Sequence, residues 1–124
     1  MTFDQAAFGP RVLEKLKEKL GHDAPFTAEE LADVTGFRVS LSDSLLGFEK
    51  LTGLKTSGCR SCEVEDLSAF TNHRLLRTFN CWYSSVRDLS ALATCPRLET
   101  IELKNCLIED LSAARAAPTR VVDL

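Results

Sequence analysis

Apolar residues in the second half of the chain recur at a fixed interval. The set Leu54, Cys59, Val64 and Leu67 is followed one interval later by Leu76, Cys81, Val86 and Leu89, and then by Leu98, Leu103, Ile108 and Leu111. A repeat of this length predicts a solenoid, because each unit is too small to bury its apolar face except by stacking on its neighbours. Within each unit the apolar residues alternate, which predicts a short strand with one inward and one outward face.

A tetrapeptide marks the same interval. Asp-Leu-Ser-Ala begins at Asp66, at Asp88 and at Asp110. The three aspartates could form a row of carboxylates, but an aspartate before Leu-Ser-Ala more simply caps a short helix or 3₁₀ turn. We therefore expect a structural role for all three.

Residues 1–33 lie outside the repeat and predict a helical cap. Pro10 stands at a first helical position, apolar residues follow at helical spacing, and Gly21 supplies a left-handed stop. Thr27 and Glu30 match a capping box that begins a second short helix through Leu31 and Ala32. The polar face of the first helix mixes both signs of charge, which is typical of a solvated surface. Its residues are Arg11, Glu14, Lys15, Lys17, Glu18 and Lys19.

The repeat spacing, L-x-x-L-x-L-x-x-C-x-I-x-D-L-x-x-L, resembles the leucine-rich repeat over residues 34–124. The 22-residue length and the helical cap are similar to the internalin-like, short bacterial type. The resemblance implies an α/β leucine-rich-repeat solenoid with a parallel sheet on its concave face and short-helix turns on its convex face. It implies one domain over 1–124, with a cap over 1–33 and four to five rungs over 34–124. It also implies protein recognition through the concave sheet, without enzymatic activity.

Both ends of the repeat region are irregular. The interval from Phe37 to Ser57 is shorter than the interval from Ser57 to Phe79, and we expect the return side of this first rung to be supplied by Leu45, Leu46, Phe48 and Leu51. At the other end, residues 116–124 align with 95–103, which predicts a last strand containing Val121, Val122 and Leu124. A strand with no cap after it would present an open edge, so we expect self-association or a partner covering that edge.

Charge and hydropathy exclude several functions. The net charge is -3 and the Lys and Arg residues are not clustered, which argues against nucleic acid or an anionic membrane as the main partner. No apolar run approaches the length that spans a bilayer, and the first residues lack the features of a secretory signal. We therefore expect a cytoplasmic protein.

Five cysteines are the main candidates for chemistry. Cys59 and Cys62 form a C-x-x-C that could be a redox pair or half of a zinc site. The register instead places Cys59 inward beside Cys81 and puts Cys62 and Cys106 at a turn position, where a thiol can meet backbone carbonyls. We expect buried, reduced cysteines with no bound metal or cofactor, and we expect Cys95, on the return side, to be the most reactive. Neither His22 nor His73 has a nucleophile placed beside it, so no catalytic residue is predicted.

Candidate binding residues are those that point outward from the strands. Trp82 and Tyr83 are the only Trp and Tyr of the chain, and aromatic residues flanked by arginines are typical of binding hot spots. The alternative is that Trp82 packs between Arg60 and Lys104 by cation–π contacts and has no partner. The predicted partner-binding residues are Arg38, Lys55, Arg60, Arg77, Asn80, Trp82, Tyr83, Glu99, Glu102 and Lys104.

The charged residues of this face predict a gradient. The cations Arg38, Lys55, Arg60 and Arg77 lie toward the amino-terminal rungs, whereas the acidic residues Glu99, Glu102 and Asp123 lie toward the other end. The sequence thus predicts a module that binds a protein partner, with a toxin-neutralising immunity protein or an adaptor as possible roles. The alternatives are a structural homo-oligomer and a cysteine-based redox or metal protein.

Overall fold

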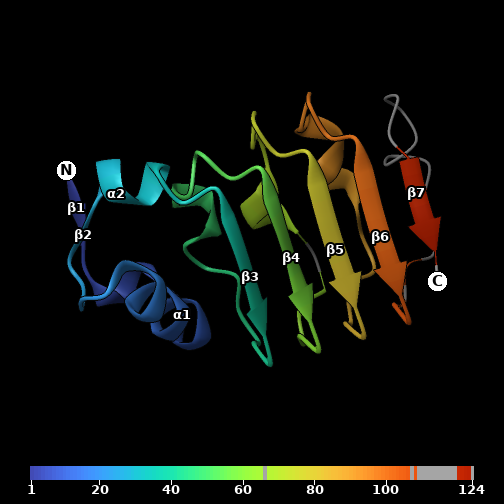
Figure 1. Cartoon of the computed structure of the whole chain (residues 1–124). Helices are drawn as coiled ribbons and strands as arrows, with labels where there is room; N and C mark the ends of the chain where they lie inside the picture. Colours follow the sequence, from blue (N-terminus) through green and yellow to red (C-terminus); the bar gives the residue numbers. More distant parts are fainter. Residues whose placement is uncertain (66, 107, 109–119, 124) are drawn as a thin grey trace.

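The computed structural model describes residues 1–65, 67–106, 108 and 120–123. Its main element is a parallel five-stranded sheet in the order β3-β4-β5-β6-β7, preceded by a small antiparallel pair, β1-β2. The five strands lie side by side and run in one direction, with α1 and α2 at the amino-terminal end (Figure 1).

The amino-terminal cap contains β1 (Thr2–Phe3), η1 (Gln5–Ala7), α1 (Pro10–Leu20), β2 (Phe26–Thr27) and α2 (Ala28–Ala32). Pro10 opens α1, and Gly21 ends it with a left-handed φ of 77°. Both hydrogen bonds of the predicted capping box join Thr27 and Glu30. The pairing of β1 with β2 was not expected from the sequence. Among the described residues, no helix is long and apolar enough to cross a membrane.

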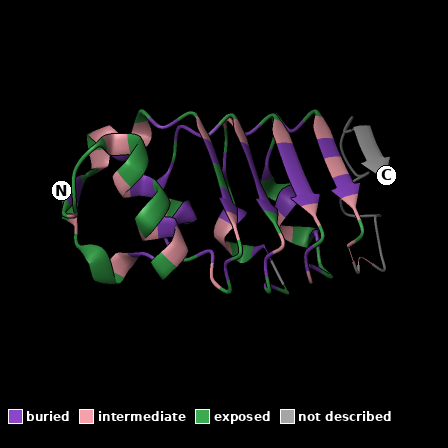
Figure 2. Ribbon diagram, turned by 60° about the horizontal axis from the view of Figure 1, so that its bottom comes forward, coloured by how far each residue is buried: buried purple, intermediate pink, exposed green. Residues whose placement is uncertain are grey.

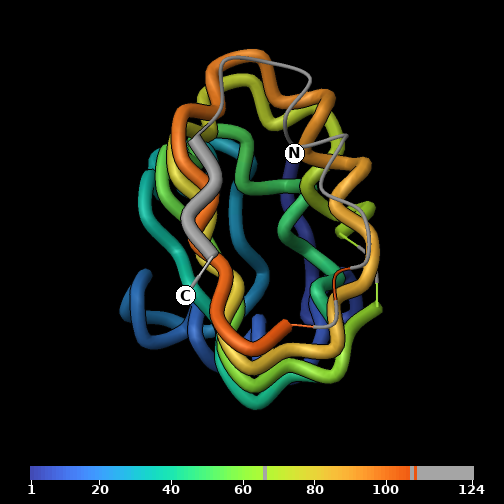
Figure 3. Tube along the Cα trace, turned by 90° about the vertical axis from the view of Figure 1, so that its right-hand side faces the viewer, coloured from blue at the N-terminus to red at the C-terminus, as the bar shows by residue number. Residues whose placement is uncertain are grey.

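The strands of the main sheet are β3 (Gly36–Ser40), β4 (Thr56–Arg60), β5 (Thr78–Trp82), β6 (Thr100–Lys104) and β7 (Arg120–Asp123). Phe37 pairs with Ser57, as the shortened first interval predicts. Ser57 pairs with Phe79, which pairs with Ile101, so the predicted repeat register is confirmed over β4, β5 and β6. Figure 3 shows the rungs superposed as nested coils, with the strands along one side and the return segments along the other.

The predicted register of the last strand is wrong by one residue. Val121 pairs with Ile101, and Asp123 pairs with Leu103, whereas the alignment by sequence placed Val122 beside Ile101 and Asp123 beside Glu102. After Leu111 the sequence has Ala114 where the preceding repeat has Leu92, and it has no leucine equivalent to Leu98. The length of the connection before β7 could therefore not be read from the sequence. Asp123 is therefore the register partner of Leu103 and not of Glu102. Leu124 lies outside the described residues.

The core lies between the sheet and three short 3₁₀ helices, η2 (Phe48–Lys50), η3 (Ser68–Phe70) and η4 (Ser90–Thr94). The ring of Phe70 is 5.0 Å from those of both Phe48 and Phe79, centroid to centroid, so an aromatic stack crosses two rungs. Leu46, expected on this buried side, is instead 48% exposed. The irregular first rung places only Leu45, Phe48 and Leu51 of that set in the core.

One of the three repeated aspartates can be located. The carboxylate of Asp88 accepts a hydrogen bond at 2.8 Å from the N–H of Ser90, the first residue of η4. Asp88 therefore satisfies a backbone donor at the start of η4, as a structural role requires, although the N-cap position itself is Leu89. Asp66 and Asp110 lie outside the described residues.

The cysteines occupy the predicted register positions. Cys59, Cys62 and Cys81 are buried, and the Cys62 thiol lies 3.4 Å from the carbonyl oxygen of Arg60. The structure argues against the predicted high reactivity of Cys95, because this residue is 2% exposed and burial raises the pKa of its thiol. The half-buried Cys106 is the most exposed cysteine. In Figure 2 the buried residues run along the strands and return segments.

Candidate functional site

Part of the predicted binding face gathers around one pocket on the outward side of the sheet, which we call the concave face. The pocket has a volume of about 360 Å³. Five of the predicted residues line it, together with Lys15 from α1: these are Arg38, Arg60, Asn80, Trp82 and Glu102. They come from β3, β4, β5 and β6, so the pocket exists only when four rungs are stacked.

A row of polar side chains crosses the floor of this pocket. The Nε and Nη2 of Arg38 donate to Oδ1 of Asn80 at 3.2 and 2.9 Å, and Nδ2 of Asn80 donates to Oε2 of Glu102. Asn80 is 8% exposed, so these bonds provide the partners that its buried amide requires. The row fixes a cation and a carboxylate at opposite ends of the pocket.

Gly58 makes this row possible. It lies between Arg38 and Asn80 in the register of the sheet. A Cβ at this position would lie 2.4 Å from the backbone oxygen of Asn80, which is far closer than van der Waals contact. A larger residue would therefore disturb the ladder and block the path by which Arg38 reaches Asn80.

Trp82 has a half-buried ring and a hydrogen-bond donor without an acceptor. Its Nε1 is buried, and no atom of the described residues accepts a bond from it. Arg60, its register partner on β4, is exposed and forms no ion pair within the described part of the chain. Among the described residues, the Trp82 Nε1 therefore has no hydrogen-bond acceptor and the Arg60 guanidinium has no ion-pair partner.

Tyr83 follows β5 directly and is held in an unusual backbone conformation. Its φ is 53°, and the equivalent residues Leu41, Ser61 and Asn105 also have positive φ. The Tyr83 N–H donates to the carbonyl of Lys104 at 2.7 Å, which locks this conformation. Bulky residues rarely adopt the left-handed region, and here the turn leaves the tyrosine 43% exposed.

The cation–π contact in this area differs from the predicted one. Nζ of Lys104 lies 5.4 Å from the ring centroid of Tyr83, whereas the sequence suggested that Lys104 and Arg60 would flank Trp82. The left-handed turn after β5 brings the Tyr83 ring beside Lys104. Within the described residues, Trp82 takes part in no such contact.

The remaining predicted residues stand apart. Lys55, Arg77 and Glu99 are exposed and form a column just before the strands. This column precedes that of Arg60 and Trp82 by nearly a full strand length, a distance of about 16 Å along the strands. The structure therefore divides the predicted residues into the pocket, the Tyr83–Lys104 pair beside it, and this distant column.

Sequence reasoning missed Lys15 and Gly58. Lys15 is exposed, as expected for the polar face of α1, but α1 lies against β3 and brings it to the pocket rim. The repeat pattern could not predict the position of Lys15, because Lys15 belongs to the cap and not to a repeat. Gly58 could have been noticed as the one glycine in an outward column of otherwise polar residues.

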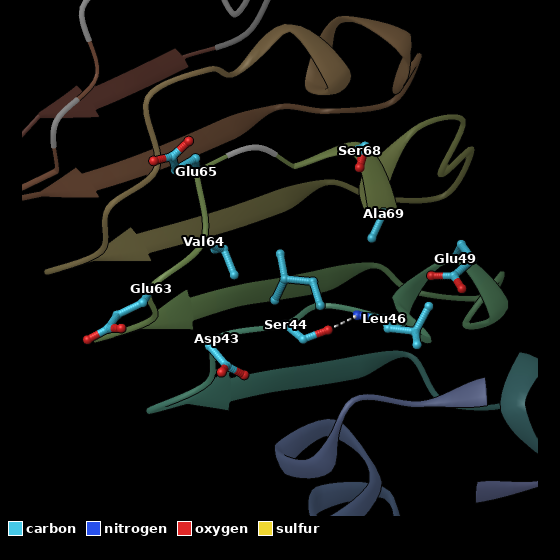
Figure 4. Close-up of a pocket in the computed structure, with 10 residues that line it drawn as sticks. Asp43, Ser44, Leu46, Glu49, Glu63, Val64, Glu65, Ser68 and Ala69 are labelled. Atoms are coloured by element: carbon cyan, nitrogen blue, oxygen red, sulfur yellow. Dashed lines mark hydrogen bonds between the residues drawn. The ribbon is translucent and has the colours of Figure 1, made fainter. Parts of the chain in front are cut away.

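A larger groove of about 550 Å³ lies on the return side of the first two rungs (Figure 4). Four carboxylates line it, alongside apolar residues that include the exposed Leu46. These acidic residues are Asp43, Glu49, Glu63 and Glu65. Burial acts to raise the pKa of Glu49, but hydrogen bonds from Lys50 and from the Gly47 N–H outweigh it and hold the pKa below its ordinary value. The groove has neither the tryptophan nor the unpaired donor of the concave pocket.

Comparison with known proteins establishes the fold. The sequence matches no family model, and no curated protein sequence matches it. An internalin (inlF) from Listeria monocytogenes superposes with a TM-score of 0.76 at 24% identity, over 87% of this chain and 34% of that one. Internalin C2 (inlC2) from the same organism superposes with a TM-score of 0.81 at 17% identity, over 95% of this chain and 55% of that one.

The predicted resemblance to internalin-like leucine-rich repeats is therefore confirmed at the level of fold. The chain is an α/β leucine-rich-repeat solenoid with a helical amino-terminal cap. It spans between about a third and about half of the length of the two internalins.

Proposed function

We propose that this chain is a non-catalytic module that binds a protein partner through its concave face. One observation carries the proposal: the only Trp and the only Tyr of the chain are adjacent, with Trp82 on the outward face of the sheet and Tyr83 exposed in the turn directly after β5. Large aromatic residues beside arginines supply most of the binding free energy at protein interfaces. A sheet also loses little conformational entropy when a partner binds, because its side chains are already fixed.

The backbone of Tyr83 supports the same proposal. Strained conformations persist where the surrounding structure enforces them, and they cluster at binding sites. Asn105 fills the equivalent turn position with a residue that tolerates positive φ. Compared with asparagine, a tyrosine at this position adds exposed aromatic surface but tolerates positive φ less well.

The charged residues of the concave face would also orient the partner. Arg38, Lys55, Arg60 and Arg77 lie on β3 to β5 or just before them, and Glu99 and Glu102 lie at β6. We expect a partner with the opposite gradient, whose association accelerates as the salt concentration falls. A cytoplasmic immunity protein that neutralises a toxin and an adaptor between two proteins are both specific forms of this function.

Affinity capture with point variants tests the proposal. We expect Trp82→Ala and Tyr83→Ala each to weaken binding of a captured and purified partner roughly tenfold or more, as truncation of a hot spot does. Leu46→Ala is the matched control, since Leu46 is also a large exposed apolar residue but lies on the return side. Circular dichroism of each variant verifies folding.

Equal affinity of all three variants for the partner would place the binding face elsewhere. Sedimentation of the purified protein separates the proposal from the alternative of a structural homo-oligomer. That alternative predicts a mass that rises with concentration and that depends on no residue of the concave face.

A further inference from the structure

Two cysteine sulfurs from neighbouring rungs are in direct contact. Sγ of Cys106 lies 3.2 Å from Sγ of Cys81 and 3.0 Å from the carbonyl oxygen of the same residue. Cys81 belongs to β5, and Cys106 comes two residues after β6, in the turn through Asn105. Reacting atoms about 3–3.5 Å apart are close enough to attack one another. A disulfide bond requires these sulfurs to approach by only about 1 Å more.

The pair also contains the most accessible thiol of the chain. Cys106 is half-buried, whereas the other four cysteines are buried. Sγ of Cys59 lies farther from Sγ of Cys81, at 3.9 Å, and Cys59 also interacts with Cys62. The thiols of Cys62 and Cys95 contact backbone carbonyl oxygens. Only the pair of Cys81 and Cys106 therefore combines direct sulfur contact with a member that a small oxidant can reach from solvent.

The contact between the two sulfurs divides their roles. The hydrogen bond with Cys81 lowers the pKa of Cys106 to about 6, and the same contact together with burial raises the pKa of Cys81. The thiolate is the reactive form of cysteine. A thiol of low pKa beside a second cysteine is the arrangement in which an oxidised sulfur is captured as a disulfide.

We propose that Cys81 and Cys106 form a reversible intramolecular disulfide on exposure to hydrogen peroxide. The Cys106 sulfur attacks one peroxide oxygen and the O–O bond breaks. Cys106 becomes a sulfenic acid, and the hydroxide that leaves takes up the proton released by Cys106. The Cys81 sulfur then attacks Sγ of Cys106, the S–O bond breaks, and the second hydroxide leaves with the Cys81 proton as water. The two thiols lose two electrons in total, and the peroxide gains them.

The new bond would fasten two neighbouring rungs to each other. It would close a loop between residues 25 apart in the sequence, and such a cross-link stabilises a protein chiefly by restricting its unfolded chain. Cys106 also follows closely on Lys104, whose Nζ lies 5.4 Å from the ring centroid of Tyr83. The bond would therefore hold the turn beside that pair. This inference goes beyond the proposed function and does not depend on it.

Mass mapping of the oxidised protein tests the proposal. The reduced full chain is exposed to a slight excess of hydrogen peroxide, free thiols are blocked with iodoacetamide, and peptides are prepared without a reductant. We expect one cross-linked pair of peptides, which joins Cys81 to Cys106, is lighter by two hydrogen atoms and is separated by dithiothreitol. The melting temperature of the oxidised protein should exceed that of the reduced protein by roughly 5 °C or more.

Three variants assign the roles. Cys81→Ala should leave Cys106 as a sulfenic acid that dimedone traps, and Cys106→Ser should abolish both the cross-link and the rise in melting temperature. Cys62→Ser is the matched control, because Cys62 holds the same turn position two rungs earlier and Ser84 holds it in the rung between. This control should oxidise like the unchanged protein. Circular dichroism verifies folding, and the cross-link map of the unchanged protein decides the matter if a variant fails to fold.

Several outcomes would overturn the inference. They are a peroxide-treated protein whose five thiols all still react with iodoacetamide after unfolding, a cross-link from Cys59 to Cys81 or to Cys62, a disulfide between two molecules, and Cys106 that accumulates as a sulfinic acid without a cross-link. None of these measurements uses a partner, so failure of this inference leaves the proposed function standing. Failure of partner binding likewise leaves the disulfide standing.

Discussion

The two faces of the sheet share one backbone but differ in how completely their side chains are satisfied. On the inward face, Phe37, Phe79 and Ile101 are at most 4% exposed. The hydroxyl of Ser57, which interrupts that column, donates to the Phe37 carbonyl at 2.7 Å. The outward face carries the unpaired N–H of Trp82 and the strained, exposed Tyr83. Packing constrains the inward positions, so groups that the fold itself does not need are found on the outward face.

The largest expected contrast is between two aromatic residues of opposite faces. Phe70→Ala should lower the free energy of unfolding by about 3–5 kcal/mol, because it leaves a cavity at the centre of the aromatic stack. Trp82→Ala should lower it by no more than about 1 kcal/mol, since its ring is outside the core. Urea denaturation of both variants measures the two losses. Similar losses would mean that Trp82 is a core residue and that the two faces are not distinct.

A substitution at Gly58 tests whether close packing also limits residue size on the outward face, at a point where neighbouring strands approach closely. Gly58→Ala should cost about 1–3 kcal/mol of stability, because its Cβ would meet the Asn80 backbone. Gly36→Ala serves as the control: the nearest atom to its Cβ would be the Thr56 hydroxyl at 3.1 Å, which can rotate away. Thermal denaturation of the two variants is the measurement. If both variants melted at the same temperature, close approach at Gly58 would not matter.

A substitution at Tyr83 should stabilise the protein, in contrast to those at Phe70, Trp82 and Gly58. Tyr83→Asn places a residue that tolerates positive φ at a left-handed position, so it should raise the free energy of unfolding by up to about 1 kcal/mol. The same change should weaken partner binding. Tyr83→Phe, which keeps the strain and the ring, is the control and should leave stability nearly unchanged. A loss of stability in Tyr83→Asn would show that the contact with Lys104 outweighs the strain.

The smallest effect concerns thiol reactivity and does not require any change in stability. Iodoacetamide should modify Cys106 of the native protein before Cys95, because the hydrogen bond with Cys81 lowers the pKa of Cys106 to about 6, whereas burial raises that of Cys95. Since the thiolate is the reactive form, the rate at Cys106 should be near its maximum at neutral pH and fall as the pH drops through the pKa of that thiol. Peptide mass mapping after short exposures measures the order.

Cys106→Ser is the control for that experiment and should abolish the fast modification. Faster modification of Cys95 would contradict the burial of the return side. It would restore the expectation drawn from the sequence, in which the return segment left that thiol accessible.

The fixed repeat interval was sufficient to predict most of the fold. It placed Cys59 beside Cys81 and Thr78 beside Thr100, because a period fixes which residues stack in neighbouring rungs. The capping box at Thr27 and the stop at Gly21 were also predictable, since each depends on a few adjacent residues. The predicted register was wrong at β7, because after Leu111 the connecting segment has no leucine equivalent to Leu98 from which to count.

The candidate site could be predicted only in outline. The sequence placed Arg60, Trp82 and Glu102 on the outward face, since alternation along a strand decides the face. It could not bring Lys15 to the same pocket, because that contact joins the cap helix to residues far along the chain. Nor could it pair Arg38 with Asn80 across Gly58, or place Lys104 over Tyr83.

The sequence alone therefore determined which residues repeat, which face each residue of β4, β5 and β6 occupies, and where α1 ends and α2 begins. Only the tertiary structure decided which polar groups find partners, and so left Trp82 with a donor that nothing in the described chain accepts. The physical reason is that side-chain direction follows from local geometry with a short period. Hydrogen-bond pairing, burial of a thiol and the depth of a pocket depend on atoms that different rungs and the cap bring together.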